Sequence, residues 1–207
     1  MVMMAVTIAF FGVRACTEGH PGSLRFGECT VDNFPDISHL MGAPPLNKLY
    51  AIMLTVYSAA KMAEARAYYN KLSTFVRPLA NNFLFFVACL AMIFGPAIGY
   101  FDVYYAFEIH CFVTDVFTYS EIIYLYSLCW IMSHNREQFG PHAQHVITRV
   151  QYQLLFVAFV GLCMGHPGIL GWDAIGEIGE WLAFFSDFIV RFQIAGVIRY
   201  TSKIVRD

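Results

Sequence analysis

The residues in this chain that could do chemistry are charged side chains that interrupt long apolar runs. Five of them lie in the run 172–198: Asp173, Glu177, Glu180, Asp187 and Arg191. Their spacing returns each time to the same side of a helix, so we expect one charged stripe in which Asp187 and Arg191 form an i,i+4 pair. The two acids nearest the start of the run also suit a helix N-terminus. A charge in the centre of a bilayer costs about 2.5–3.5 kcal/mol, so the stripe should face protein or water.

A second apolar run, 103–132, carries four more polar groups: Glu108, His110, Asp115 and Glu121. His110 and Glu121 are three helical turns apart and share a face, whereas Glu108 and Asp115 lie on a different face. Two interpretations are open. The charges form a path for an ion, a proton or a polar lipid headgroup, or they form a buried polar seam. Such a seam, closed by His110, Glu121 and Arg191, would fix the packing of the helices or dock a subunit.

No motif for covalent or metal catalysis accompanies these charges. The sequence contains no GxSxG, HExxH, CxxC, P-loop or GxGxxG pattern. His134, His142 and His145 are close in sequence, but no carboxylate or cysteine completes a ligand set, so they indicate a solvated loop. The tetrapeptide Gly-His-Pro-Gly occurs at 19–22 and 165–168, which predicts two turns or a paired histidine site. We expect a protein that is not an enzyme and that uses no cofactor or metal.

The composition indicates which elements must position these residues. Hydrophobic residues make up 58% of the 207 and charged residues only 14%, with a mean hydropathy of +0.54, whereas a soluble domain carries about 25% charged residues. The apolar residues fall into six blocks: 2–16, 46–67, 79–98, 103–132, 150–164 and 172–198. We expect each block to be a transmembrane helix. The predicted fold class is all-α, a polytopic membrane protein with six helices in one bundle, a single domain and a polar loop at 17–45.

Four of these blocks have features that bear on packing. Blocks 2–16 and 150–164 are short for a span, which needs about 20 residues. Gly95 and Pro96 predict a kink or an end in the block 79–98. Near the end of the block 46–67, Lys61 and Glu64 are three residues apart and can pair on one helical face.

Basic residues are distributed unequally between the two sides of the predicted bundle. Six spans place both termini on one side, and nine basic residues lie there: Lys61, Arg66, Lys71, Arg77, Arg136, Arg149, Arg199, Lys203 and Arg206. The opposite side has only Arg14, Arg25 and Lys48. The positive-inside rule then predicts termini in the cytosol, or in the matrix of a mitochondrion. On the opposite side, Cys16 and Cys29 either form a disulfide or remain two reduced thiols.

Short motifs in order along the chain resemble the Frag/DRAM/Sfk family of six-helix membrane proteins. The residues that carry the resemblance are Phe34, Pro35, Asp36, Ile37, Ser38, Pro44, Pro45, His110, Glu180 and Trp181. The family includes autophagy modulators and proteins of GPI-anchor lipid remodelling. The resemblance implies the six-helix fold. In the competing interpretation as a lipid-remodelling protein, His110, Glu121 and Glu180 would handle a polar headgroup inside the bundle. The short first block and the extra acids Glu108, Asp115, Glu121 and Asp187 depart from the family pattern.

From these features we expect an accessory or scaffolding subunit of a larger membrane assembly, such as a respiratory-type complex of the mitochondrial inner membrane. The short blocks and the acids on two faces of 103–132 favour contact with neighbouring proteins. The alternative is an endomembrane protein of lipid or GPI-anchor remodelling, or an autophagy modulator, that binds a lipid headgroup. Membrane lipids and other membrane subunits are the expected partners. A net charge of −2 without a basic tract argues against nucleic acid.

Overall fold

The computed structural model describes residues 46–101, 103, 105–165, 185–187 and 189–198, together with Ile37 and Met41. Its labelled elements are α3 (Leu46–Leu72), α4 (Pro78–Tyr100), α5 (Phe107–His134), the 3-10 turn η1 (Arg136–Gln138) and α6 (Gly140–Gly165). Residues 185–187 and 189–198 are also helical, and we call them the C-terminal segment. Every regular element in this part of the chain is a helix, which confirms the all-α class there.

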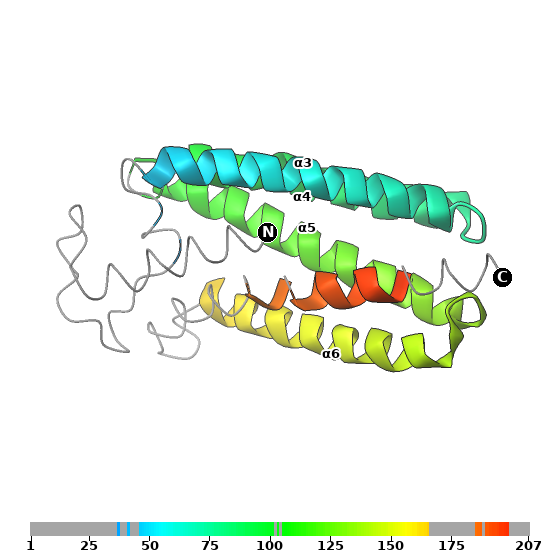
Figure 1. The fold of residues 1–207 in the computed structure, drawn as a ribbon. Coiled ribbons are helices and arrows are strands. Elements are labelled where there is room, and N and C mark those ends of the chain that lie inside the picture. Colours follow the sequence, from blue (N-terminus) through cyan, green and yellow to red (C-terminus); the bar gives the residue numbers. More distant parts are fainter. Residues whose placement is uncertain are drawn as a thin grey trace.

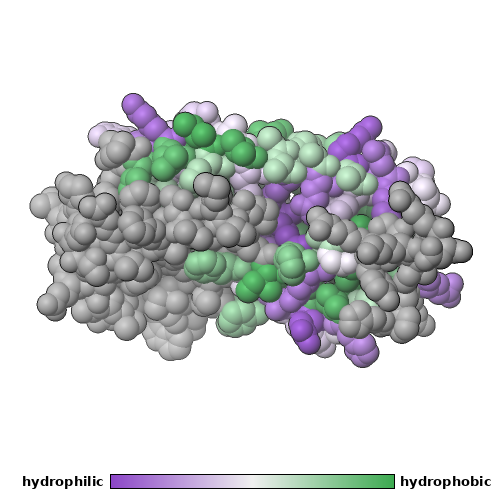
Figure 2. Space-filling view, in the orientation of Figure 1, coloured by the Kyte–Doolittle hydropathy of each residue, from purple (hydrophilic) through white to green (hydrophobic). Residues whose placement is uncertain are grey.

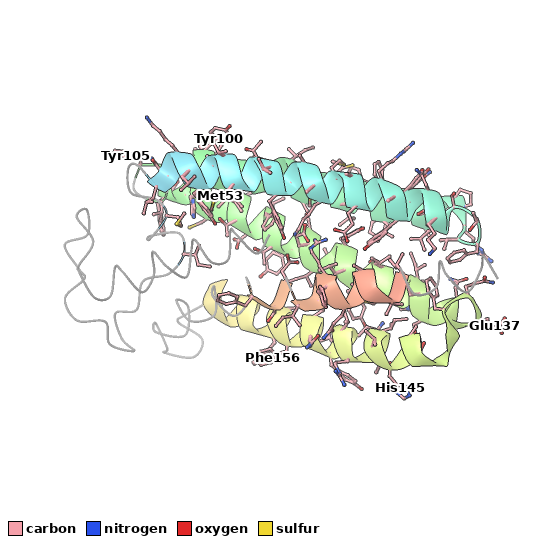
Figure 3. The ribbon with its side chains drawn as sticks, viewed as in Figure 1. Met53, Tyr100, Tyr105, Glu137, His145 and Phe156 are labelled. Atoms are coloured by element: carbon pink, nitrogen blue, oxygen red, sulfur yellow. The ribbon has the colours of Figure 1, made fainter. Side chains whose placement is uncertain are left out.

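The described helices run alternately in opposite directions along one bundle. Consecutive helices contact each other, α3 with α4, α4 with α5 and α5 with α6, and the C-terminal segment lies between α5 and α6 (Figure 1). Tight turns at 73–77 and 135–139 place the end of α3 and the start of α6 at the same end of the bundle. We call this the basic end, because Arg66, Lys71 and Arg149 lie towards it. Figure 3 shows Glu137 at the basic end, with Tyr100 and Tyr105 at the opposite end.

Small residues allow α3 and α4 to approach closely. A Cβ atom on Gly99 would lie 2.4 Å from Cα of Ala51, and one on Gly95 would lie 2.6 Å from Oγ of Ser58. The two glycines are four residues apart, the small-xxx-small spacing that lets helix backbones pack in membranes. The predicted kink or end at Gly95 and Pro96 does not end α4, which contains Pro96 and continues to Tyr100. This stretch instead forms the contact surface with α3.

Two apolar clusters fill the described bundle. The larger lies towards the basic end and joins residues of all four labelled α-helices and the C-terminal segment, including Leu128, Met132, Val150 and Val190. The smaller lies at the other end, where Ile37 and Met41 pack with Tyr50, Leu54, Ile98 and Val113. Ile37 belongs to the family-like loop motif, so that part of the motif is anchored in the core. The other loop residues, Phe34, Pro35, Asp36, Ser38, Pro44 and Pro45, lie outside the described residues.

The outer surface of the bundle is rich in apolar side chains. On α4 these include Leu79, Phe83, Phe86 and Ile93. In Figure 2 the hydrophilic side chains on the visible face gather towards the basic end, at the right. By length and composition, α4 is the one described helix able to cross a membrane. Taken alone this is a weak indication of membrane association, because a core helix of a soluble protein can meet the same criterion.

The helix bounds differ from the predicted blocks at several points. α6 begins at Gly140, ten residues before the predicted block 150–164, so this helix is not short. His134 is the last residue of α5, and His142 and His145 lie on α6, so the predicted histidine loop is wrong. α3 continues five residues beyond the predicted block, to Leu72. The block 2–16, most of the block 172–198, the cysteines Cys16 and Cys29 and the turn 19–22 lie outside the described residues.

Candidate functional site: a buried charge cluster

Charged side chains from three elements meet inside the bundle near the middle of its length. Lys61 lies midway along α3, Glu121 midway along α5, and Asp187 and Arg191 on the C-terminal segment. Because α3 and α5 run in the same direction, their central residues lie at a similar height. We call Lys61, Glu64, Glu121, Asp187 and Arg191 the charge cluster.

The distances show a connected set of ion pairs. Nζ of Lys61 lies 3.0 Å from Oδ2 of Asp187 and 3.3 Å from Oε2 of Glu121. Nε of Arg191 lies 3.1 Å from Oδ1 of Asp187, and Nη2 of Arg191 pairs with Oε2 of Glu121. Nη1 of Arg191 lies 3.9 Å from Oε2 of Glu64. Each cation therefore contacts both Asp187 and Glu121, and the cluster ties α3, α5 and the C-terminal segment together.

The cluster combines deep burial with an imbalance of formal charge. Lys61 is 3%, Arg191 4% and Glu121 5% exposed, whereas the side chains of Asp187 and Glu64 are 23% and 28% exposed. These ion pairs join two cations to three carboxylates, which gives a formal charge of −1 if all are ionised. Buried charges require such pairing, because the loss of hydration is costly.

Aromatic side chains enclose the cations. The hydroxyl of Tyr57 donates a hydrogen bond of 2.6 Å to Oδ2 of Asp187. Nζ of Lys61 lies 4.0 Å from the centre of the same tyrosine ring, and Cζ of Arg191 lies 5.9 Å from that of Tyr124. These distances are in the range of cation–π attraction, which is strongest away from water.

His110 belongs to the same buried side of α5 but makes a separate contact. Its Nδ1 lies 2.6 Å from the carbonyl oxygen of Phe101, the residue that follows α4. A carbonyl oxygen only accepts, so Nδ1 carries the proton and donates. Nε2 of His110 is buried without a hydrogen-bond partner among the described residues. His110 thus fastens the turn between α4 and α5, whereas the predicted seam would have placed it with Glu121 and Arg191.

The other predicted site residues fall into two groups. Glu108 and Asp115 are exposed on the outer side of α5, opposite the buried His110 and Glu121, as their spacing indicates. Glu177 and Glu180 lie outside the described residues, as do Asp173 and Trp181. A headgroup site that uses His110, Glu121 and Glu180 is therefore not visible in the described part of the chain.

Sequence reasoning did not assign Lys61 to this site. The expected pairing of Lys61 with Glu64 is replaced by pairs of Lys61 with Asp187 and Glu121, while Glu64 lies nearest to Arg191. One signal could have identified the lysine, because it interrupts a run of apolar and small residues as Asp187 does in its own helix. The expected pair of Asp187 and Arg191 is present. The aromatic neighbours of the charge cluster, Tyr57 and Tyr124, gave no comparable signal in the sequence.

The arrangement is suited to holding helices together, because its charged atoms face one another. Within the described residues, no group of three His, Cys, Asp or Glu side chains is placed to hold a metal ion. Oε1 of Glu121 is nevertheless buried without a hydrogen-bond partner in this part of the chain. One carboxylate oxygen of the cluster is therefore still available to a water molecule or a proton.

A further polar contact closes the basic end. Nζ of Lys71, in the last turn of α3, donates a hydrogen bond of 3.0 Å to the carbonyl oxygen of Ile198. The hydrogen bond thus ties the last turn of α3 to the C-terminal segment.

Comparison of the chain with protein-family models, with curated proteins and with solved structures found no match. The resemblance to the Frag/DRAM/Sfk family therefore stays a prediction from the sequence motifs.

Proposed function

We propose that this protein is a non-catalytic, multi-pass membrane protein that serves as an accessory subunit of a larger membrane assembly. The observation that carries the proposal is a continuous stripe on the outer side of α5. It consists of Glu108, Phe112, Asp115, Tyr119, Ile123, Tyr126 and Trp130, all exposed. The steps of three and four residues are those of a helix that packs against another helix.

The composition of this outer α5 stripe favours protein over lipid as its neighbour. Tyrosine and tryptophan combine a large apolar area with a hydrogen-bonding group, and they are enriched in protein interfaces. The exposed carboxylate of Glu108 lies on the same stripe, and a carboxylate facing hydrocarbon is costly. The exposed side of α4, with Leu79, Phe83, Phe86 and Ile93, is by contrast uncharged and mostly apolar, which suits lipid. The two outer faces thus differ in the partner that each can accept.

The six-helix membrane bundle is part of the same proposal. α3, α5 and α6 are long enough to span a bilayer, at 27, 28 and 26 residues. The charges that lower the hydropathy of α3 and α5 include Lys61 and Glu121, and both are buried in ion pairs. Charges hidden in the bundle do not meet lipid, so they are compatible with spanning helices. We place the basic end on the cytosolic or matrix side. Labelling Cys29 and the C-terminus from the same side of the membrane would contradict this topology.

Site-specific photo-crosslinking tests the subunit role. A benzoylphenylalanine at position 119 or 126, in the tagged full chain in its native membrane, should give an adduct with one protein of defined mass. The same probe at position 86 on α4 serves as the matched control, because Phe86 is also an exposed aromatic residue, and it should give lipid adducts only. The double variant Glu108→Gln/Asp115→Asn should weaken the adduct at position 126.

Two outcomes would contradict the subunit role. An adduct of twice the mass of this chain would show self-association through the outer α5 stripe. Equal lipid labelling from positions 86, 119 and 126, with no protein adduct, would show that α5 faces the bilayer like α4.

A further inference from the structure

A groove lies between α6 and the C-terminal segment, away from the charge cluster. Its volume is about 660 Å³, and its lining includes His145, Arg149, Tyr152 and Phe156 of α6 and Ser186 of the C-terminal segment. Figure 3 shows that His145 and Phe156 point away from α3 and α4. The charge cluster does not use these side chains, and the proposed partner contact on α5 does not involve them.

Along α6, the side chains that line the groove change from basic to aromatic. His145, Arg149, Tyr152 and Phe156 follow one another at steps of four, three and four residues, so they lie on one side of the helix. The rise per residue places His145 and Phe156 about 16 Å apart along the axis. His145 and Arg149 lie towards the basic end, and the exposed rings of Tyr152 and Phe156 lie deeper along the helix. This order matches a phospholipid, whose phosphate lies at the membrane surface and whose chains extend inward.

The charges indicate which phospholipid fits. Arg149 makes no ion pair with any other described residue, and the described lining contains no carboxylate. The neighbour of Ser186, Asp187, is engaged with Lys61 and Arg191 inside the bundle. A choline or ethanolamine ammonium group would therefore find no counter-charge in the groove, whereas the net negative charge of an anionic lipid would be balanced by Arg149.

We propose that this groove binds an anionic glycerophospholipid. The guanidinium of Arg149 holds the phosphate, with His145 and Ser186 as further hydrogen-bond donors. Gln153 lies one turn deeper on the lining, at the level of the lipid ester groups, where its amide nitrogen can donate to an ester carbonyl. An acyl chain then packs along Tyr152 and Phe156. The inference rests on the proposed membrane embedding but not on the α5 partner.

Native mass spectrometry of the full chain, purified in mild detergent, tests the site. We expect phosphatidylglycerol to be retained more tightly than phosphatidylcholine with the same acyl chains. Arg149→Gln should weaken phosphatidylglycerol binding about tenfold or more, because a charge-assisted hydrogen bond to the phosphate is lost together with the one positive charge that balances the anionic lipid. It should weaken the zwitterionic phosphatidylcholine less. Arg66→Gln removes an exposed helical arginine outside the groove and should have no effect. Phe156→Ala should weaken both lipids.

Several results would overturn the proposal. These are equal retention of the two lipids, wild-type binding by Arg149→Gln, or no effect of Phe156→Ala on either lipid. Displacement of phosphatidylglycerol by soluble glycerol phosphate would show a site for free phosphate rather than for lipid. A photo-probe at position 152 that captures a protein would assign the groove to a partner chain. Loss of the α5 adducts with lipid binding intact would contradict only the subunit role.

Discussion

Arg191 is the residue whose replacement should perturb the described bundle most. Its guanidinium contacts Glu121, Asp187 and Glu64, so Arg191→Met leaves three carboxylates with Lys61 as their single cation. The formal charge of the cluster changes from −1 to −2 in a region where Glu121 is 5% exposed. Removing one partner of a buried pair costs about 3–5 kcal/mol, because the remaining charge is buried without compensation. We expect Arg191→Met to lower the free energy of unfolding by that amount.

Removal of the opposite charge should have a smaller effect. Glu121→Gln leaves two cations with Asp187 and Glu64, so the formal charge of the cluster becomes zero. The loss is then that of the ion pairs of Glu121 with Lys61 and Arg191, about 1.5–3 kcal/mol, which is the range for contacts of charged groups. The charge imbalance therefore predicts that Arg191→Met is more destabilising than Glu121→Gln. If all three carboxylates were equally well compensated, the two variants would cost the same.

Urea titration in mild detergent, followed by helical circular dichroism, measures both variants. Lys48→Met is the control, because Lys48 is an exposed lysine near the start of α3, and it should leave the midpoint unchanged. The matching variant Lys61→Met should behave like Arg191→Met, since it also raises the net negative charge. The reasoning is refuted if Glu121→Gln destabilises as much as Arg191→Met, or if Arg191→Met unfolds at the same midpoint as the control.

Two further predictions concern packing and the turn between α4 and α5. Gly99→Ala should destabilise the bundle by about 1–3 kcal/mol in the same titration, because its Cβ would meet the α3 backbone at Ala51. Gly196→Ala, in open space on the C-terminal segment, should be neutral or stabilising by up to about 1 kcal/mol. Equal effects of Gly99→Ala and Gly196→Ala would contradict the close contact of Gly99 with α3. His110→Phe should cost about 1–3 kcal/mol, because the carbonyl of Phe101 loses its donor. His110→Asn restores a donor and should recover part of that loss; no difference between the two His110 variants would argue against the hydrogen bond.

Much of the local structure could be predicted from the sequence. The apolar blocks 46–67, 79–98 and 103–132 correspond to α3, α4 and α5, because long apolar runs favour helices of spanning length. The spacing of residues also separates two faces of α5, and the structure buries His110 and Glu121 on one and exposes Glu108 and Asp115 on the other. The predicted block 150–164 begins ten residues after the start of α6. Its first turns contain polar residues, and polar residues extend a helix beyond an apolar run without marking its start.

The sequence by itself determined the relations within one helix, because these depend only on the regular rotation per residue. The pairing of Asp187 with Arg191 is a relation of this kind, and so is the division of α5 into two sides. The all-α class follows from the same local patterns. Only the tertiary structure decided which helices meet and at what height. Close contact of Gly95 and Gly99 with α3 fixes that helix against α4, and the same packing brings Lys61 to Glu121 and Asp187. Such contacts join residues 60 and 126 positions apart, and no local periodicity encodes a separation of that length.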